Sequence, residues 1–284
     1  MQPASANHVP PRHPVRLDGV PETLLWTLYN RAREAMRFDA ILRDPEAIRL
    51  YRSIEYDYER SFGKPDISHA MRSRIFDDAL RPWLAAHPGF TVVELACGLE
   101  TQFQRCDDGR VRWICVDVPE VIELRARLLP ENRRCLLLAG SALDLDWLDA
   151  IDPAREVFVS AQGLFMYFEP DRVRDLLATL DRRLPGATLM FDTIPPWFSR
   201  KTLAGFDKTP HYRAPPMPWG IARDAIEPTL RTWMPHARRI DITPFGMQRG
   251  LSGRLFRLLA RAPGLRALPP NIVRVEIGAD PSPE

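Results

Sequence analysis

The chain has 284 residues, 45% of them hydrophobic, and a formal net charge of +2 at pH 7. This length supports one large domain or a domain with an added flank, and the near-neutral charge gives no strong attraction to nucleic acid or to an anionic membrane. No apolar run approaches the ~20 residues that cross a bilayer. Composition therefore disfavours a nucleic-acid binder and a membrane partner.

Cysteine and histidine usage gives no sign of a disulfide framework or a metal site. Cys97, Cys106, Cys115 and Cys135 contain no CxxC pairing, and the six histidines form no HExxH motif. The N-terminal residues lack the apolar core of a signal peptide. We therefore expect a soluble protein of the reducing cytoplasm, with residues 1–18 as a disordered leader.

The first third of the chain has helical periodicity. It predicts helices over residues 21–38 and 45–54, and a third that begins with Asp66 as N-cap and extends to about Ala86. Pro82 is expected to kink this third helix or end it early. These elements form a predicted N-terminal helical segment, residues 19–88.

From Thr91 onward, strands alternate with helices, which predicts a parallel, doubly wound α/β sheet within residues 89–284. The expected strands are 91–96, 111–116, 134–139, 157–161 and 188–193. The expected helical segments are 99–105, 119–129, 145–151 and 171–184.

The late part of the chain breaks this alternation. Residues 195–220 are rich in proline and aromatic side chains, which favours an ordered insert without long helices. A helical stretch over 221–234, interrupted by Pro228, follows the insert. Two strand-like pieces, 239–243 and 272–277, complete the chain.

The first strand of the sheet ends in a turn with one glycine. The turn Ala96-Cys97-Gly98-Leu99-Glu100 lacks the second and third glycines of GxGxxG, and no Lys-Ser/Thr pair follows as in a P-loop. A nucleotide-dependent oxidoreductase is therefore disfavoured. The turn indicates a ligand that has a ribose or similar group but no phosphates.

The second strand ends in Asp117, about 20 residues after the turn. A carboxylate there can accept hydrogen bonds from both hydroxyls of a ribose. The alternative is that Asp117 only caps the helix that follows. Together with the turn, Asp117 predicts a phosphate-free nucleoside at the first two strands, which points to S-adenosyl-L-methionine.

Several segments of the chain together resemble a known family. VVELACGLETQFQR, VRWICVDVPEVIELRARLLP, LAGSALDLDWLD and FVSAQGLFMYFEP are similar to the leucine carboxyl methyltransferase family, in its bacterial branch of polyketide O-methyltransferases. The likeness runs from about Asp44 to Thr193 and includes AMRSRIFDDAL ahead of the sheet. It implies a Rossmann-like class I methyltransferase fold, in which the two late strand pieces complete a seven-stranded, mostly parallel sheet, and S-adenosyl-L-methionine as cofactor.

The resemblance also implies which residues bind the cofactor. Ala96, Gly98 and Asp117 would hold its methionine part and ribose, Ser141 and Ala142 would lie against adenine, and Gln162 would face the site.

The family also uses an arginine from the helix before the first strand to bind the cofactor's carboxylate. Helical spacing favours Arg72 over Arg74, because Arg72 shares a face with Phe76 and Trp83. A structural salt bridge, for example to Asp117 or Glu94, is the alternative role for Arg72.

The chain departs from the family pattern at four positions. Ala96, Glu100, Gln102 and Gln162 stand where the family has glycine, aspartate, arginine and glutamate. Ala96 narrows the space for the cofactor's close approach to the turn, and Gln162 removes a charge near the site. None of the four replacements is bulky. The alternative to an active enzyme is therefore a catalytically silent protein that binds S-adenosyl-L-methionine and acts through a partner.

The implied reaction is methyl transfer to a carboxylate or phenolic hydroxyl of a small acid or polyketide-like molecule. Alignment and exclusion of water supply most of the rate enhancement, and an ionised carboxylate needs no base, whereas a phenol with pKa near 10 usually does. No catalytic residue is assigned, because His211 and His236 are expected to have surface or structural roles.

We expect the acceptor pocket to be walled by aromatic residues of the insert together with one residue from the fourth strand's loop, and Lys201 or Arg213 to attract an anionic substrate. The alternative is that these aromatic residues only pack the insert onto the sheet. The candidates are Tyr167, Trp197, Phe198, Lys201, Tyr212, Arg213 and Trp219. The sequence does not indicate the oligomeric state or the identity of the acceptor.

Overall fold

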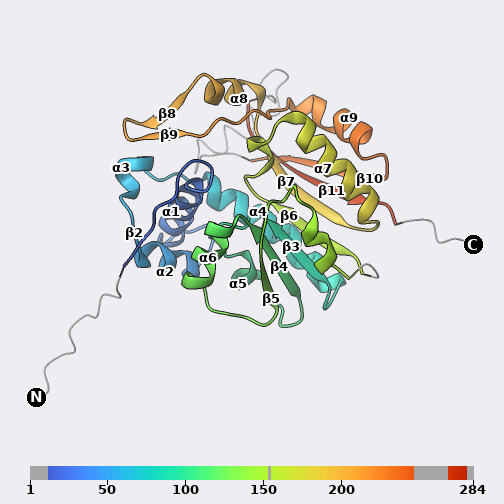
Figure 1. Ribbon diagram of the computed structural model, residues 1–284, viewed down its shortest axis with the longest axis horizontal. Coiled ribbons are helices and arrows are strands. Elements are labelled where there is room, and N and C mark those ends of the chain that lie inside the picture. Colours follow the sequence, from blue (N-terminus) through green and yellow to red (C-terminus); the bar gives the residue numbers. More distant parts are fainter. Residues whose placement is uncertain (1–11, 153–154, 246–267, 280–284) are drawn as a thin grey trace, which may run out of the picture.

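A computed structural model describes residues 12–152, 155–245 and 268–279. At its centre lies a seven-stranded sheet with the order β10-β11-β7-β6-β3-β4-β5 (Figure 1). Within this sheet β11 runs antiparallel to both neighbours, and the remaining described pairings are parallel. The strands are β3 (Thr91–Leu95), β4 (Arg112–Asp117), β5 (Cys135–Ala139), β6 (Val157–Ala161), β7 (Thr188–Thr193), β10 (Ala237–Pro244) and β11 (Asn271–Ile277). The Rossmann-like class I methyltransferase fold is thereby confirmed.

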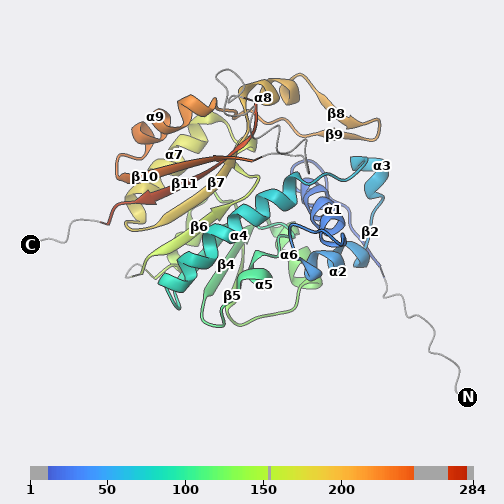
Figure 2. The same cartoon turned by 180° about the vertical axis from the view of Figure 1, so that it is seen from behind.

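Helices cover both faces of the sheet. On the face seen in Figure 2, α4 (Ser68–Ala86) crosses the strands, and its buried residues share a core with α5 (Gln102–Cys106) and α6 (Pro119–Leu128). On the opposite face, α7 (Pro170–Arg183) and α9 (Arg223–Trp233) pack on the sheet (Figure 1). The two cores take alternate strand residues, as the period of two requires: Val92 faces α4, whereas Val93 faces α7. Two short 3₁₀ helices, η1 (Asp146–Ala150) and η2 (Phe165–Tyr167), follow β5 and β6.

The N-terminal segment folds onto the edge of the sheet. It comprises α1 (Thr23–Ala35), α2 (Pro45–Ser53) and α3 (Tyr58–Phe62), with β1 (His13–Pro14) pairing in parallel with β2 (Ile54–Glu55). Its core includes Val121, Leu124 and Leu128 of α6 and Leu99 of the turn after β3. The N-terminal helices therefore lie directly against the turn that was expected to bind the cofactor.

Both prolines that were expected to interrupt helices lie inside them, so an early end at Pro82 and a break at Pro228 are wrong, while a kink at Pro82 stays a prediction. The α4 helix continues through Pro82, and the α9 helix continues through Pro228. A proline removes the hydrogen bond to the carbonyl four residues earlier, and those residues, Asp78 and Asp224, are exposed. Water can therefore bond the freed carbonyls.

Some helices begin or end at slightly different residues from those expected. Asp66 does bond the start of α4 by accepting from Ser68 N at 2.9 Å, although the helix begins at Ser68. The helix expected over 99–105 begins only at Gln102, because the turn before it uses residues with positive φ. The stretch expected to be helical over 145–151 forms the 3₁₀ helix η1.

The insert forms an ordered unit of its own. It contains α8 (Pro196–Leu203) and a hairpin of β8 (Phe206–Thr209) and β9 (Tyr212–Ala214), which lie beside α3 at the top of Figure 1. Thr209 Oγ1 donates to Ser61 O at 2.8 Å, which ties the hairpin to the N-terminal segment. The insert thus joins two parts of the chain about 150 residues apart.

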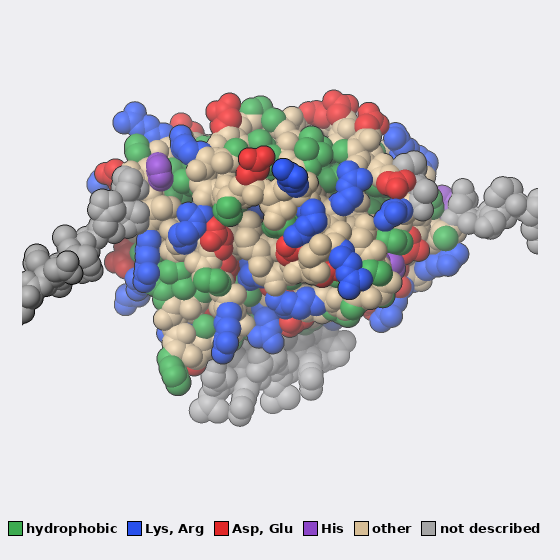
Figure 3. Space-filling model, turned by 90° about the horizontal axis from the view of Figure 1, so that it is seen from below, with side chains coloured by type: hydrophobic (Ala, Val, Ile, Leu, Met, Phe, Trp, Pro, Cys, Tyr) green, Lys and Arg blue, Asp and Glu red, His purple; other side chains and the backbone are tan. Residues whose placement is uncertain are grey.

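The surface carries mixed charge. On the face shown in Figure 3, basic and acidic side chains are interspersed rather than gathered by sign. Among the described helices, none combines the length and apolar character needed to cross a membrane.

Candidate functional site

Asp117 links the carboxyl ends of β3 and β4. Its Oδ2 accepts a hydrogen bond from Gly98 N at 2.7 Å, and its Oδ1 accepts from Val118 N at 2.8 Å. Burial raises the pKa of Asp117, against the opposing effect of these two donors. The bond to Val118 does not cap α6, because Val118 is itself the N-cap residue and α6 has no side-chain cap hydrogen bond, while the bond to Gly98 joins the carboxylate to the turn. The interpretation of Asp117 as only a helix cap is therefore wrong, and its role in binding a ribose stays a prediction.

The turn after β3 has a backbone that suits glycine at two positions. Gly98 has φ of +47°, and a Cβ added there would lie 3.2 Å from Leu24 Cβ of α1. Ala96 has φ of +52° although it carries a Cβ. A non-glycine residue in this region costs about 1–2 kcal/mol. The replacement of glycine by alanine at position 96 is therefore tolerated at the expense of backbone strain.

Three buried polar side chains, which we call the amide cluster, lie between this turn and β6: Gln102, Ser160 and Gln162. Gln102 Oε1 accepts from Ser160 Oγ at 3.4 Å and from Gln162 Nε2 at 3.5 Å. Gln102 Nε2 and Gln162 Oε1 are buried and have no hydrogen-bond partner within the described chain. A buried unpaired polar group is costly, so a ligand that donates to Gln162 would remove part of this cost.

Arg72 is buried on α4, as helical spacing predicted, whereas Arg74 is exposed and pairs with Asp78. Arg72 Nη1 lies 3.1 Å from Asp192 Oδ2 at the end of β7, so its carboxylate partner is neither the suggested Asp117 nor Glu94. Asp192 Oδ1 also accepts from Gly163 N at 2.5 Å. Arg72 Nε is buried without a partner in the described residues, which leaves one donor for a further acceptor.

Ser141 and Ala142 follow β5. Ser141 N donates to Asp144 Oδ2 at 3.1 Å, and Ala142 is buried, with its carbonyl accepting from Trp147 Nε1 at 3.1 Å. The cofactor candidates therefore all lie beyond the carboxyl ends of the parallel strands, apart from Arg72, which reaches the same edge from α4. Open α/β sheets bind their ligands at this edge.

The structure does not gather the seven acceptor candidates into one group. Tyr167 and Phe198 pack in one small apolar cluster with Met166, Ile194 and Met217, and burial raises the pKa of Tyr167. Trp197 is 44% exposed and donates to Leu268 O at 3.1 Å. The ring centroids of Trp197 and Phe198 lie 5.5 Å apart, so Phe198 contacts Trp197 and packs against the same small cluster as Tyr167.

The other four candidates have different surroundings. Tyr212 is buried against Trp26 and Phe62, with its hydroxyl unpartnered among the described residues. Trp219 packs in the sheet core. Lys201 lies 4.0 Å from the ring centroid of Phe206, and the exposed Arg213 pairs with Asp207 at 2.7 Å.

Sequence reasoning missed His69, which lies three residues before Arg72 on α4. Asn30 Oδ1 accepts from Asp66 N at 3.2 Å, so Asn30 Nδ2 is the group that faces His69 Nδ1, at 3.0 Å. His69 Nδ1 therefore accepts, and Nε2 carries the proton. Burial lowers the pKa of His69 to about 3, with Arg72 acting in the same direction, so the ring is neutral near pH 7. The sequence signal for His69 was its position three residues before the buried Arg72, because residues at that spacing are neighbours on a helix surface.

Histidine–carboxylate pairs do occur elsewhere in the described chain. His236 Nδ1 lies 2.7 Å from Asp181, and His87 Nε2 lies 2.9 Å from Glu156. Both lie toward the amino ends of the parallel strands, away from Asp117. His211 is exposed at the tip of the β8–β9 hairpin. These placements agree with the surface or structural roles expected for His211 and His236.

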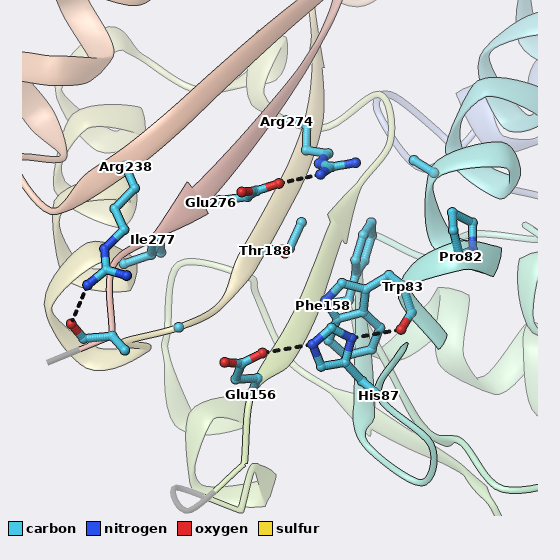
Figure 4. A pocket seen from close by; sticks show the side chains of 13 residues that line it. Pro82, Trp83, His87, Glu156, Phe158, Thr188, Arg238, Arg274, Glu276 and Ile277 are labelled. Atoms are coloured by element: carbon cyan, nitrogen blue, oxygen red, sulfur yellow. Dashed lines mark hydrogen bonds and ion pairs between the residues drawn. The ribbon is translucent and has the colours of Figure 1, made fainter. Parts of the chain in front are cut away.

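A cavity of about 450 Å³ opens at that opposite edge, between α4 and the starts of β6 and β7 (Figure 4). His87 pairs there with Glu156, Arg274 pairs with Glu276, and Arg238 donates to Ala279 O. The charged groups of this cavity thus have partners within the described chain, and the cavity lies at the edge where such sheets do not bind ligands.

Comparisons with known proteins agree with these observations. A family model described as leucine carboxyl methyltransferase matches residues 25–181. The tetracenomycin polyketide synthesis O-methyltransferase TcmP of Streptomyces glaucescens is 39% identical over 189 residues, which cover 66% of this chain and 70% of that protein. The S-adenosyl-L-methionine-dependent methyltransferase dpfgK of Gibberella zeae is 31% identical over 182 residues, 57% of this chain and 61% of that protein.

A solved structure shares the fold. A protein from Bordetella parapertussis, described as a possible exported protein, has a TM-score of 0.55 and 17% identity, and the match covers 89% of this chain and 79% of that one. At this identity the likeness concerns the fold alone.

Proposed function

This chain belongs to the leucine carboxyl methyltransferase family, and from that premise we propose that it transfers a methyl group to an oxygen atom of a small organic acid or polyketide-like phenol. Its cofactor is S-adenosyl-L-methionine, and its activity is that of a methyltransferase. The observation that carries the site proposal is the Asp117–Gly98 contact, which places a carboxylate and a one-glycine turn at the carboxyl edge of the sheet. The likeness to an O-methyltransferase supports an oxygen acceptor.

The described residues fit this cofactor. Asp117 has accepting capacity beyond its two backbone donors and would bind ribose hydroxyls. Gln162 Oε1, an unpaired acceptor, suits the cofactor's ammonium group, and Arg72 Nε, an unpaired donor, suits its carboxylate. Ala96 and Gly98 would face the methionine part, and Ser141 and Ala142 the adenine. When bound, the cofactor supplies an electrophilic methyl group on a positively charged sulfur.

The acceptor would bind between α1, α4 and the insert. The ring centroids of Trp26 and His69 lie 5.5 Å apart, and those of Trp26 and Tyr212 lie 6.3 Å apart. Tyr167 and Phe198 would extend this aromatic wall, with Trp197, Lys201, Arg213 and Trp219 as further acceptor candidates. The residues of this chain would hold the acceptor oxygen in line with the methyl group and exclude water.

A carboxylate is the acceptor that this geometry supports best. His69, the histidine beside Arg72, carries its proton on Nε2 and is therefore a donor rather than a base. A carboxylate is ionised at neutral pH and needs no base, and it accepts hydrogen bonds from such a donor. A phenol would have to lose its proton to another group.

The cofactor site is tested by Asp117→Asn. We expect isothermal titration to show about 10- to 100-fold weaker binding of S-adenosyl-L-methionine, because a hydrogen bond to a charged group is worth roughly 1.5–3 kcal/mol. Glu120→Gln, an exposed carboxylate one residue into α6, is the matched control and should bind as the wild type does. Equal affinity in Asp117→Asn and wild type would contradict the site.

The acceptor class is tested by transfer of a labelled methyl group to a panel of aromatic acids and the matched phenols. We expect label in methyl esters, at a rate that is flat between about pH 6 and 8 because the carboxylate is already ionised. Label in phenol ethers, at a rate that increases with pH, would replace the carboxylate by a hydroxyl. Binding of the cofactor without transfer to any acid or phenol would favour the silent protein.

A further inference from the structure

Arg125 of α6 binds the backbone of the turn after β3. The residue is 1% exposed on its side chain, and its Nη1 donates to Gly98 O at 3.0 Å, to Glu100 O at 2.7 Å and to Cys97 O at 3.5 Å. A single guanidinium nitrogen thus contacts three carbonyl oxygens of one turn.

Arg31 of α1 binds the carbonyl that Arg125 leaves out. Its Nη2 donates to Leu99 O at 2.7 Å. Each carbonyl from residue 97 to residue 100 therefore meets a buried guanidinium, and the two arginines come from elements on different sides of the turn. With their oxygens held by arginine, these peptide groups cannot rotate without breaking charge-assisted hydrogen bonds.

The turn needs such restraint because its backbone is strained. Ala96, which precedes the four held carbonyls, has φ of +52° with a Cβ present. A strained backbone persists only where the surrounding contacts over-determine it. The arginine contacts meet that requirement at the residues that follow Ala96.

The backbone contacts of Arg125 are shorter than its contact with the nearest carboxylate. In the described chain its nearest carboxylate is Glu94, at 4.0 Å from Nη2, and burial raises the pKa of Glu94 well above its usual value. Arg125 Nη2 has no hydrogen-bond partner among the described atoms. Burying a charged side chain costs free energy compared with an apolar one, and the backbone contacts of Nη1 offset part of this cost.

We propose that Arg125 is a positioning residue for the cofactor, which holds the strained turn in the conformation that presents Gly98 and Asp117 to the ligand. The proposal rests on the cofactor site described above. Arg125 acts through the backbone of residues 97–100 and does not touch the cofactor itself. Its contribution therefore depends on the strain at Ala96, and glycine at position 96 should reduce the need for it.

The test is a double-mutant cycle between Arg125→Met and Ala96→Gly, read by isothermal titration of S-adenosyl-L-methionine into the full-length protein. We expect Arg125→Met to weaken binding at least 10-fold, and the effect of Ala96→Gly on affinity to be larger in the Arg125→Met background than in the wild-type background. In the Arg125→Met background, Ala96→Gly should restore at least 3-fold of the lost affinity, because glycine adopts the positive φ without strain. A purely structural role for Arg125 would not produce this specific rescue.

Further readouts separate positioning from folding. Amide hydrogen exchange at residues 98–101 should speed up in Arg125→Met without ligand. In turnover assays KM for the cofactor should rise while KM for the acceptor stays constant. Arg127→Met, an exposed arginine two residues along α6, is the matched control and should bind as the wild type does. If Arg125→Met does not fold, Arg125→Lys serves in its place, because lysine keeps the charge but not the three-carbonyl contact.

Two outcomes are distinguishable. If Arg125→Met, or Arg125→Lys where that variant is used, binds the cofactor with wild-type affinity, the positioning role is overturned and the cofactor site stays intact. The same holds if Arg125→Met loses equal affinity with and without Ala96→Gly. Failure of the wild type to bind S-adenosyl-L-methionine would overturn the cofactor site, and the exchange rates would still report whether Arg125 restrains the turn.

Discussion

Two buried polar regions meet at α5, and they differ in how completely they are paired. One, which we call the charged cluster, consists of Arg31, Asp44, Asp77, Glu100 and Arg105. The other is the amide cluster. The charged cluster ties the N-terminal helices to the turn, whereas the amide cluster lies toward the carboxyl end of β6.

In the charged cluster every carboxylate oxygen has a donor. Asp44 Oδ2 accepts from Arg31, Thr101 and Arg105, while Asp44 Oδ1 accepts from Ala47 N. Glu100 accepts from Arg31 and Arg105 through Oε1 and from Ser73 through Oε2. Among the described side-chain atoms of this cluster, Arg31 Nε is buried without a hydrogen-bond partner, but the carboxylates are fully paired and need no ligand.

In the amide cluster, by contrast, a donor on Gln102 and an acceptor on Gln162 have no partner within the described chain. The comparison teaches how to separate scaffold from site: buried polar groups that are fully paired hold the fold, and those left unpaired at a sheet's carboxyl edge indicate where a ligand binds. The predictions below challenge or refine this distinction.

The largest effect is expected from Arg105→Met. Removing this guanidinium leaves Asp44, Asp77 and Glu100 buried with only part of their pairing, and loss of one partner of a buried ion pair costs about 3–5 kcal/mol. Urea unfolding should show a decrease of that size in the free energy of unfolding, or no folded protein. Arg81→Met removes an exposed arginine that also contacts Asp77, at 3.4 Å, and should cost less than about 1 kcal/mol. Similar losses in both variants would show that the charged cluster is not the scaffold described.

A smaller effect is expected where charge is introduced into the amide cluster. Gln102→Arg places a lone charge beside Gln162, at the 3.5 Å contact, and should lower the free energy of unfolding by at least about 3 kcal/mol. Adding Gln162→Glu should recover about 1–3 kcal/mol, because arginine and glutamate would then pair. Additive effects in a double-mutant cycle by denaturant unfolding would contradict the contact.

The smallest effect concerns pH. Burial raises the pKa of Glu100, but Arg31 and Arg105 outweigh it and bring the pKa below its usual value. A depressed folded-state pKa gives stability that is complete above the unfolded value of about 4.3 and is lost as the pH falls below it, at up to about 1.4 kcal/mol per pH unit. Because burial raises the pKa of Glu94 and Asp117, these groups act in the opposite direction.

The measurement is therefore a difference between two proteins. Free energies of unfolding of wild type and Glu100→Gln, compared from pH 7 to pH 3, should converge as the pH falls below about 4.3. Parallel curves would show that Glu100 is not held ionised by the charged cluster. Gln102→Glu is not a suitable control, because it would add a titrating group to the amide cluster.

Much of the fold could be predicted from local patterns. Short apolar runs alternating with helical segments placed β6 and β7 at their observed bounds, and the helical repeat identified Arg72 as the buried arginine of α4. Gly98 and Asp117 were expected at one ligand site at the carboxyl edge of the sheet, and the structure shows in addition that a hydrogen bond joins them. The family likeness supplied the cofactor and the seven-stranded order.

The sequence by itself thus determined the elements, their layering and the class of cofactor, because each depends on residues a few positions apart or on a shared edge. Only the tertiary structure decided the partner of Arg72, which is Asp192, 120 residues later, and the meeting of Gln102 with Gln162. It also distributed the insert's aromatic residues over separate clusters and set the positive φ at Ala96. These features depend on how distant elements pack against each other, for which no local spacing carries a signal.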